Sequence, residues 1–80
     1  MTKPQETFAI RLLREQSAAG LRTYQLAKIT GIRANVLHQL ENGMFNPSFK
    51  TLVSLARALD VSADYLCGLI DERRPLGAKS

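Results

Sequence analysis

Residues 26–43 decide the fold, and they read LAKITGIRANVLHQLENG. Gly31 divides this stretch into two short segments, and a glycine adopts the left-handed backbone conformation of a tight turn without steric cost. In the second segment Leu37 and Leu40 are three residues apart, so they share one face of a helix. Ala27 is small enough to let two helices approach each other. The pattern predicts two short helices that cross steeply around a glycine-containing turn.

Helical signals also flank this stretch, and no segment has the alternating pattern of a strand. We expect helices at about Gln5–Ala19, Thr23–Thr30, Ala34–Glu41, Ser48–Leu59 and Ala63–Leu69. Ser48 and Ser62 are good N-caps, and Gly20 is a natural stop for the first helix. The sequence therefore predicts an all-α domain.

Each predicted helix carries apolar residues at the spacing of a core-facing stripe. The expected core residues are Phe8, Ile10, Leu12 and Leu13 on the first helix, Leu26, Ala27 and Ile29 on the second, Leu37 and Leu40 on the third, and Phe49, Leu52, Val53, Ala56 and Leu59 on the fourth.

If Leu37 and Leu40 face inward, the helical period fixes the opposite side of the third helix. That side presents Ala34, Asn35, His38 and Gln39, with Arg33 at the helix start. Asn and Gln can pair with adenine, Arg with guanine, and a methyl group can contact thymine. A solvated polar face is the simpler interpretation for an isolated helix. The position of this face on the second helix of a helix-turn-helix pattern favours DNA readout.

Composition narrows the function classes. The chain has 80 residues, enough for one small domain, and a formal net charge of +4. That charge suits a polyanionic partner, although an ordinary basic protein fits the charge alone equally well. A single Cys67 excludes an internal disulfide, and one His with one Cys does not supply the four ligands of a structural zinc site. We expect no metal, no cofactor, no membrane span and a cytoplasmic location.

With these motifs in place, the chain resembles the lambda-repressor-like, Cro-type helix-turn-helix regulators, the XRE family found in bacterial and phage-type regulators. The matching residues are Ile10-Arg11-Leu12-Leu13-Arg14-Glu15, Gly20-Leu21, Leu26-Ala27, Thr30-Gly31-Ile32, Leu37, Leu40-Glu41-Asn42-Gly43, Asn46-Pro47-Ser48, Thr51-Leu52, Leu55-Ala56, Ala58-Leu59 and Val61-Ser62. The resemblance covers about Phe8 to Leu69. It implies a compact five-helix bundle whose third helix enters the major groove, with two half-sites about one DNA turn apart in a homodimer.

Several residue roles follow from this resemblance. The base-reading set implied by position is Arg33, Ala34, Asn35, His38 and Gln39. Thr23 and Asn42 match phosphate-contacting positions, and Arg22, Lys28 and Lys50 are further phosphate candidates. Arg14 and Glu41 occupy positions that often form a structural ion pair, the alternative being two independent surface charges.

The sequence departs from the family pattern at three places. Arg22 and Arg33 replace the Ser or Thr that commonly cap the second and third helices. Residues 16–19 add about two positions, so the first helix is expected to extend or bulge. In the loop after the third helix, Met44 and Phe45 stand where relatives often have basic residues. This change weakens the expected binding to DNA phosphates and offers apolar surface to a partner subunit.

Residues 1–70 are therefore predicted to form a DNA-binding domain, followed by a flexible basic tail at 71–80. The last predicted helix has more apolar residues than one short helix is expected to bury, among them Tyr65, Leu69 and Ile70. Two explanations remain open: these residues form a two-fold dimer interface, or the last helix is well buried in its own chain. The leading function is a transcription regulator, most simply a repressor, that binds double-stranded DNA. An antitoxin-like or adaptor protein that binds a partner such as a toxin is the alternative. No catalytic set or phosphate-binding glycine loop points to an enzyme.

Overall fold

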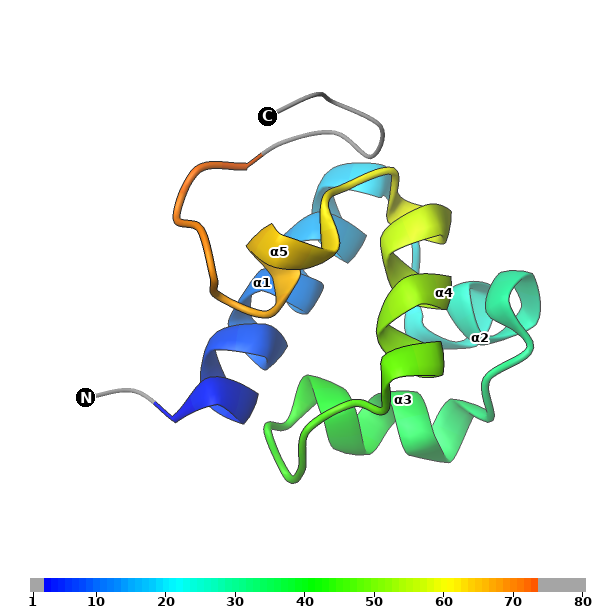
Figure 1. The fold of residues 1–80 in the computed structure, drawn as a ribbon. Coiled ribbons are helices and arrows are strands. Elements are labelled where there is room, and N and C mark those ends of the chain that lie inside the picture. Colours follow the sequence, from blue (N-terminus) through cyan, green and yellow to red (C-terminus); the bar gives the residue numbers. More distant parts are fainter. Residues whose placement is uncertain (1–2, 74–80) are drawn as a thin grey trace.

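A computed structural model describes residues 3–73 of the chain. This part forms five helices and no strand: α1 (Pro4–Ala19), α2 (Thr23–Thr30), α3 (Ala34–Glu41), α4 (Phe49–Leu59) and α5 (Ala63–Leu66). In Figure 1, α4 stands above α3 and beside α2, while α1 and α5 lie together on the other side. The predicted all-α class is confirmed. No helix in residues 3–73 is long and apolar enough to cross a membrane.

The turn between α2 and α3 forms as the glycine pattern predicts. Gly31 has a φ of 77° and donates its backbone N–H to the carbonyl of Ala27 at 2.9 Å. The Thr30 hydroxyl donates to the carbonyl of Leu26 at 2.8 Å and accepts from the backbone N–H of Ile32 at 3.2 Å. These bonds end α2 and fix the direction in which the chain enters α3.

α1 extends rather than bulges. It runs for 16 residues from Pro4, which suits the first helical position, to Ala19, and Gly20 ends it with a φ of 70°. Its buried residues include Phe8, Leu12 and Glu15, which are four and three positions apart and lie along one stripe. The two extra positions are therefore absorbed as additional helix.

α5 is shorter than predicted. The helix ends at Leu66 and not at Leu69. Gly68 has a φ of 88°, and the backbone N–H of Leu69 donates to the carbonyl of Asp64 at 2.9 Å. A left-handed glycine reverses the chain and ends the helix, because the residues beyond it no longer follow the helical axis.

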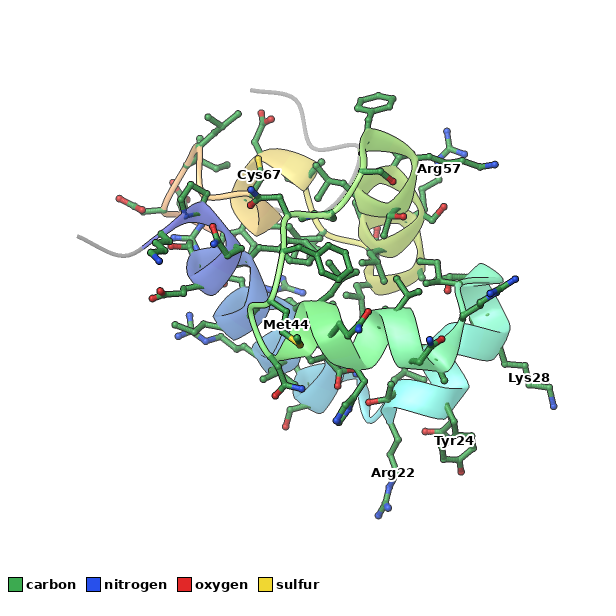
Figure 2. All side chains as sticks on the ribbon, turned by 90° about the horizontal axis from the view of Figure 1, so that it is seen from below. Arg22, Tyr24, Lys28, Met44, Arg57 and Cys67 are labelled. Atoms are coloured by element: carbon green, nitrogen blue, oxygen red, sulfur yellow. The ribbon has the colours of Figure 1, made fainter. Side chains whose placement is uncertain are left out.

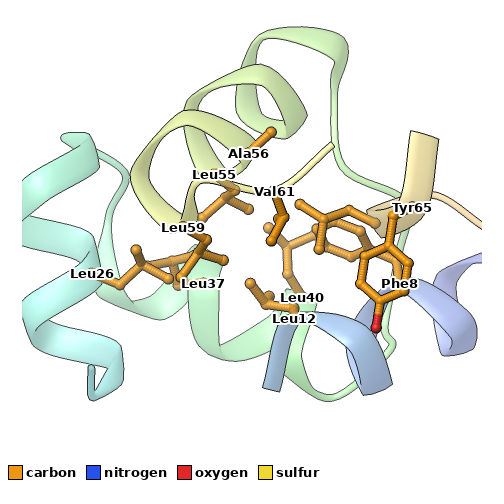
Figure 3. Close-up of a cluster of buried hydrophobic side chains, with 11 residues drawn as sticks. Phe8, Leu12, Leu26, Leu37, Leu40, Leu55, Ala56, Leu59, Val61 and Tyr65 are labelled. Carbon is orange, nitrogen blue, oxygen red and sulfur yellow. The ribbon is translucent and has the colours of Figure 1, made fainter. Parts of the chain in front are cut away.

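The core is built mainly from leucines contributed by all five helices. Figure 3 shows the central cluster, in which Leu26 and Leu37 meet Leu55 and Leu59 at one end, and Phe8 meets Tyr65 at the other. The fully buried side chains are Phe8, Leu12, Leu26, Leu37, Leu40, Leu55, Val61 and Leu66. Burying a side chain of this size contributes about 1.5–3 kcal/mol relative to leaving it in water.

Four residues predicted for the core are exposed instead: Ile10, Leu13, Ile29 and Phe49. Ile10 lies two positions from both Phe8 and Leu12, about 200° around the helix from each. Phe49 is 82% exposed because it lies in the first turn of α4, before the buried part of that helix begins. The buried stripes are therefore narrower than the apolar content of the helices suggests.

The chain after α5 is held against α1. The Arg11 guanidinium donates to the carbonyls of Tyr65 at 2.5 Å and Ile70 at 2.6 Å, and it lies 4.5 Å from the centre of the Tyr65 ring. It also pairs with Asp71 at 3.2 Å. Two residues later, Arg73 pairs with the buried Glu15. Residues 71–73, assigned to the tail from sequence, are thus bound to the domain, and residues 74–80 lie outside the described residues.

Candidate nucleic-acid interface

The outward face of α3 is set by its two buried leucines. Leu37 and Leu40 are fully buried, as predicted. On the opposite side Ala34, Asn35 and His38 are exposed. Arg33, the N-cap residue of α3, is also exposed, whereas Gln39 is half-buried. A short helix therefore presents a small methyl group, an amide, an imidazole and a guanidinium to solvent.

An open hollow lies beside this face, between the first turns of α2 and α3. Its volume is about 550 Å³, and its lining residues are Arg22, Thr23, Tyr24, Ala34, Asn35 and His38. The hollow thus joins three of the predicted base-reading residues to the start of α2. Arg33, Gln39, Lys28 and Lys50 do not line it.

Tyr24 lines the hollow although it is not among the residues predicted for the interface from sequence. It is 64% exposed at the second position of α2. Figure 2 shows Arg22, Tyr24 and Lys28 extending from α2 away from the body of the protein. A signal was present in the sequence, since Tyr24 directly follows two predicted phosphate-contacting residues at the start of a helix.

Arg22 caps α2 with its backbone and leaves its guanidinium exposed. The backbone N–H of Arg22 donates to the Gln25 side-chain oxygen at 2.8 Å, which is half of a capping box. The N-terminal end of α2, with its unpaired backbone N–H groups, favours anions. Arg22 therefore combines an exposed positive charge with the partial positive charge of a helix end.

Thr23 has a structural partner within the protein. Its hydroxyl donates to the carboxylate of Glu41 at 2.8 Å from both oxygens, and Glu41 is only 8% exposed. The hydroxyl hydrogen is thereby used inside the domain, so the predicted phosphate contact of Thr23 is reduced to its backbone N–H. The Thr23–Glu41 bond connects the start of α2 to the end of α3.

The predicted Arg14–Glu41 ion pair is not formed. Arg14 is exposed, and in the described part of the chain the carboxylate of Glu41 meets Thr23 and, at 3.8 Å, Nδ1 of His38. The extension of α1 explains the error, because Glu15 and Gln16 occupy the buried side at this end of the helix. Arg14 lies about 200° around the helix from Gln16 and points to solvent.

The remaining phosphate candidates lie at separate places. Asn42 is the exposed C-cap residue of α3, and its Nδ2 donates to the carbonyl of His38 at 2.8 Å. This bond holds the amide in place and leaves its oxygen and second N–H free of partners in the described residues. Lys28 is exposed on α2 and Lys50 in the first turn of α4.

The three residues predicted for a dimer interface differ in their exposure to solvent. Tyr65 is buried in the core of its own chain, so it is not available to a partner. Leu69 is 77% exposed, and Ile70 is half-buried against the core. Residues 3–73 hold no group of three or more His, Cys, Asp and Glu side chains that would suit a metal ion.

A comparison with protein families matches residues 10–66 to the family described as Helix-turn-helix. The chain belongs to the helix-turn-helix family. The match covers more than half of the chain, including α2, the glycine turn and α3, and it confirms the lambda-repressor-like resemblance. This helix-turn-helix protein is thus a member of a family of DNA-binding regulators. Comparisons with curated proteins and with solved structures found no significant match.

Proposed function

We propose that this helix-turn-helix protein is a sequence-specific transcription regulator, most simply a repressor, that reads the major groove with α3 as a homodimer. The observation that carries the proposal is the exposed face of Arg33, Ala34, Asn35 and His38 on a helix anchored by two buried leucines. An α-helix fits the major groove of B-DNA, where such side chains reach base edges.

Phosphate contacts position the reading helix in this proposal. Arg22 stands at the start of α2 and Asn42 at the end of α3, so they flank the exposed face of the two helices. Contacts of this kind fix the register of the protein on the duplex without reading its sequence. Each neutralised phosphate releases counterions, so added salt weakens binding steeply.

The proposed regulator represses transcription and binds its operator as a homodimer. Occupying an operator blocks transcription without a second activity, so repression is the simplest outcome of binding. A homodimer doubles the bases read and makes occupancy depend steeply on protein concentration. In such a homodimer Leu69, which is 77% exposed after α5, would be available for an apolar contact between the two copies.

In vitro selection from a random DNA pool tests this function. We expect enrichment of a two-fold symmetric motif whose half-sites lie about one helical turn of DNA apart. An enriched motif without symmetry contradicts the homodimer but keeps the reading helix. A folded protein that enriches no motif contradicts sequence-specific binding altogether.

Two variants separate base reading from phosphate contact. Gln39→Ala removes a predicted base contact and is expected to cost about 1–3 kcal/mol on the selected site, with relaxed preference at one position. Asn42→Ala is expected to weaken selected and random DNA by similar factors, because phosphates are the same in every sequence. Titrations of both duplexes at one fixed salt concentration provide the comparison. An equal loss on both duplexes for Gln39→Ala would rule out a base-reading role for Gln39.

A protein-binding role is the second candidate, and one observation favours it. Met44 and Phe45, in the loop after α3, are both exposed apolar side chains. An adaptor or antitoxin-like protein would use such a loop to bind a partner such as a toxin. Purification with one stoichiometric protein and no retention of DNA would favour this function over the first.

A further inference from the structure

We propose that the hollow between α2 and α3 is a binding site for the 5-methyl edge of a thymine, with Tyr24 as its wall. This inference rests on the proposed DNA-binding function and names one base that the site would read. It assigns a specificity-determining role to Tyr24, which was not among the site residues predicted from sequence.

The lining of the hollow has the two parts that a thymine edge requires. Among the lining residues, Tyr24 and Ala34 carry an aromatic ring and a methyl group, while Asn35 and His38 carry hydrogen-bonding groups. In the major groove thymine presents its C5-methyl group next to the O4 acceptor. The amide of Asn35 has N–H groups that can donate to O4 while the methyl group enters the apolar part.

The other bases match this arrangement less well. Cytosine presents an amino donor and no methyl group, and the purines present N7 with an oxygen or an amino group. Only thymine fills apolar surface and accepts a hydrogen bond at neighbouring positions. The hollow is open and measures about 550 Å³, so the edge of a pyrimidine can enter it.

The position of the hollow agrees with a base rather than another apolar ligand. Ala34 and Asn35 are the first two residues of α3, and the N-terminal residues of a recognition helix contact base edges. Arg22 forms one side of the hollow at the start of α2. A positive charge and a helix N-terminus beside the opening favour an occupant that carries phosphate.

The exposure of Tyr24 is consistent with a role in the complex with DNA. The residue is 64% exposed, although a tyrosine ring gains stability by burial. Contact with a base edge would cover the ring only in the complex. Tyr24 would then contribute to affinity and to sequence preference while adding little to the stability of the free protein.

Single replacement of thymine by deoxyuridine tests the inference, because the two bases differ by the methyl group alone. The probe is the duplex with the highest affinity from the random-pool selection, with each dT replaced in turn by dU. We expect dissociation constants about fourfold higher at one position in each half-site, the loss expected for one methyl group. The same factor should separate 5-methylcytosine from cytosine at that position.

Variants of Tyr24 assign the effect to the hollow. Tyr24→Ala removes the wall, so the ratio of affinities for dT and dU at that position should fall to about one. Tyr24→Phe keeps the ring and loses only the hydroxyl, so the ratio should be kept. Circular dichroism and urea unfolding establish that both variants fold like the parent protein.

Three results would overturn the inference. They are a selected half-site without thymine, equal affinities for dT and dU at every position, and a dT preference that Tyr24→Ala leaves unchanged. Each leaves sequence-specific binding intact and so rejects only the thymine site. Failure of the selection to enrich any motif rejects the proposed function itself, and the thymine site with it.

Discussion

Thr23 and Glu41 form the contact that most directly joins the two helices of the motif. The Thr23 hydroxyl lies 2.8 Å from both carboxylate oxygens of Glu41, and the carboxylate is buried at the end of α3. A buried carboxylate is costly unless hydrogen bonds replace the water it has lost. The expected partner, Arg14, is turned to solvent, so one hydroxyl carries much of this role.

Replacing Thr23 by Val should therefore destabilise the protein by about 1–3 kcal/mol, because it leaves a buried acceptor without its donor. Urea unfolding followed by circular dichroism measures the change as a lower midpoint concentration at an unaltered slope. Thr23→Ser keeps a hydroxyl at the same position and is expected to lose less. If Thr23→Val and Thr23→Ser unfold at the same urea concentration, the bond does not stabilise the fold.

Helix bounds were predictable wherever local signals set them. The bounds of α2 and α3 match the predicted ones because a glycine turn and two spaced leucines act within a few residues. α5 was predicted to be too long because its apolar residues continue to Leu69, whereas the chain leaves the helix before Gly68, which has a φ of 88° and packs closely against α1. A methyl group added to Gly68 would lie 3.2 Å from Cγ2 of Thr7, a residue distant in sequence. Local periodicity carries no information about such a contact.

The turn between α2 and α3 offers a test in which packing plays no part. A side chain added at Gly31 would meet no atom within 4 Å, but the φ of +77° strains any residue with a Cβ atom. Gly31→Ala should therefore cost about 1–2 kcal/mol, from the backbone alone. Gly31→Asn is the matched control and should cost less, because asparagine tolerates the left-handed region better. Thermal or urea unfolding compares the two, and equal stability of Gly31→Ala and the parent protein would contradict this account of the turn.

At the scale of the whole molecule, the site was predictable in part. The outward face of α3 followed from Leu37 and Leu40, because the helical period fixes the opposite side once the buried side is known. The hollow was not predictable, since it depends on how closely the first turns of two helices approach. The Glu15–Arg73 pair was missed because its members are 58 residues apart. Their pairing requires the folded path of the entire chain.

That pair, together with the Arg11–Asp71 pair, binds residues 71–73 to α1. Glu15 is 3% exposed, and both of its carboxylate oxygens accept from Nε of Arg73 at 2.9 Å. Removing the guanidinium leaves a buried carboxylate without this donor, which is more costly than losing a surface ion pair. Because the Arg73 side chain is about half exposed, solvent screens part of the interaction.

Arg73→Ala is therefore expected to destabilise the protein by about 1–2 kcal/mol. Arg57→Ala is the matched control, since Arg57 is exposed on α4 and forms no ion pair with another described residue; its effect should be within about 0.5 kcal/mol. Adding Glu15→Gln to Arg73→Ala should restore part of the lost stability, because an amide is less costly to bury than an unpaired carboxylate. Equal unfolding midpoints for Arg73→Ala and Arg57→Ala would show that the segment after α5 does not stabilise the bundle.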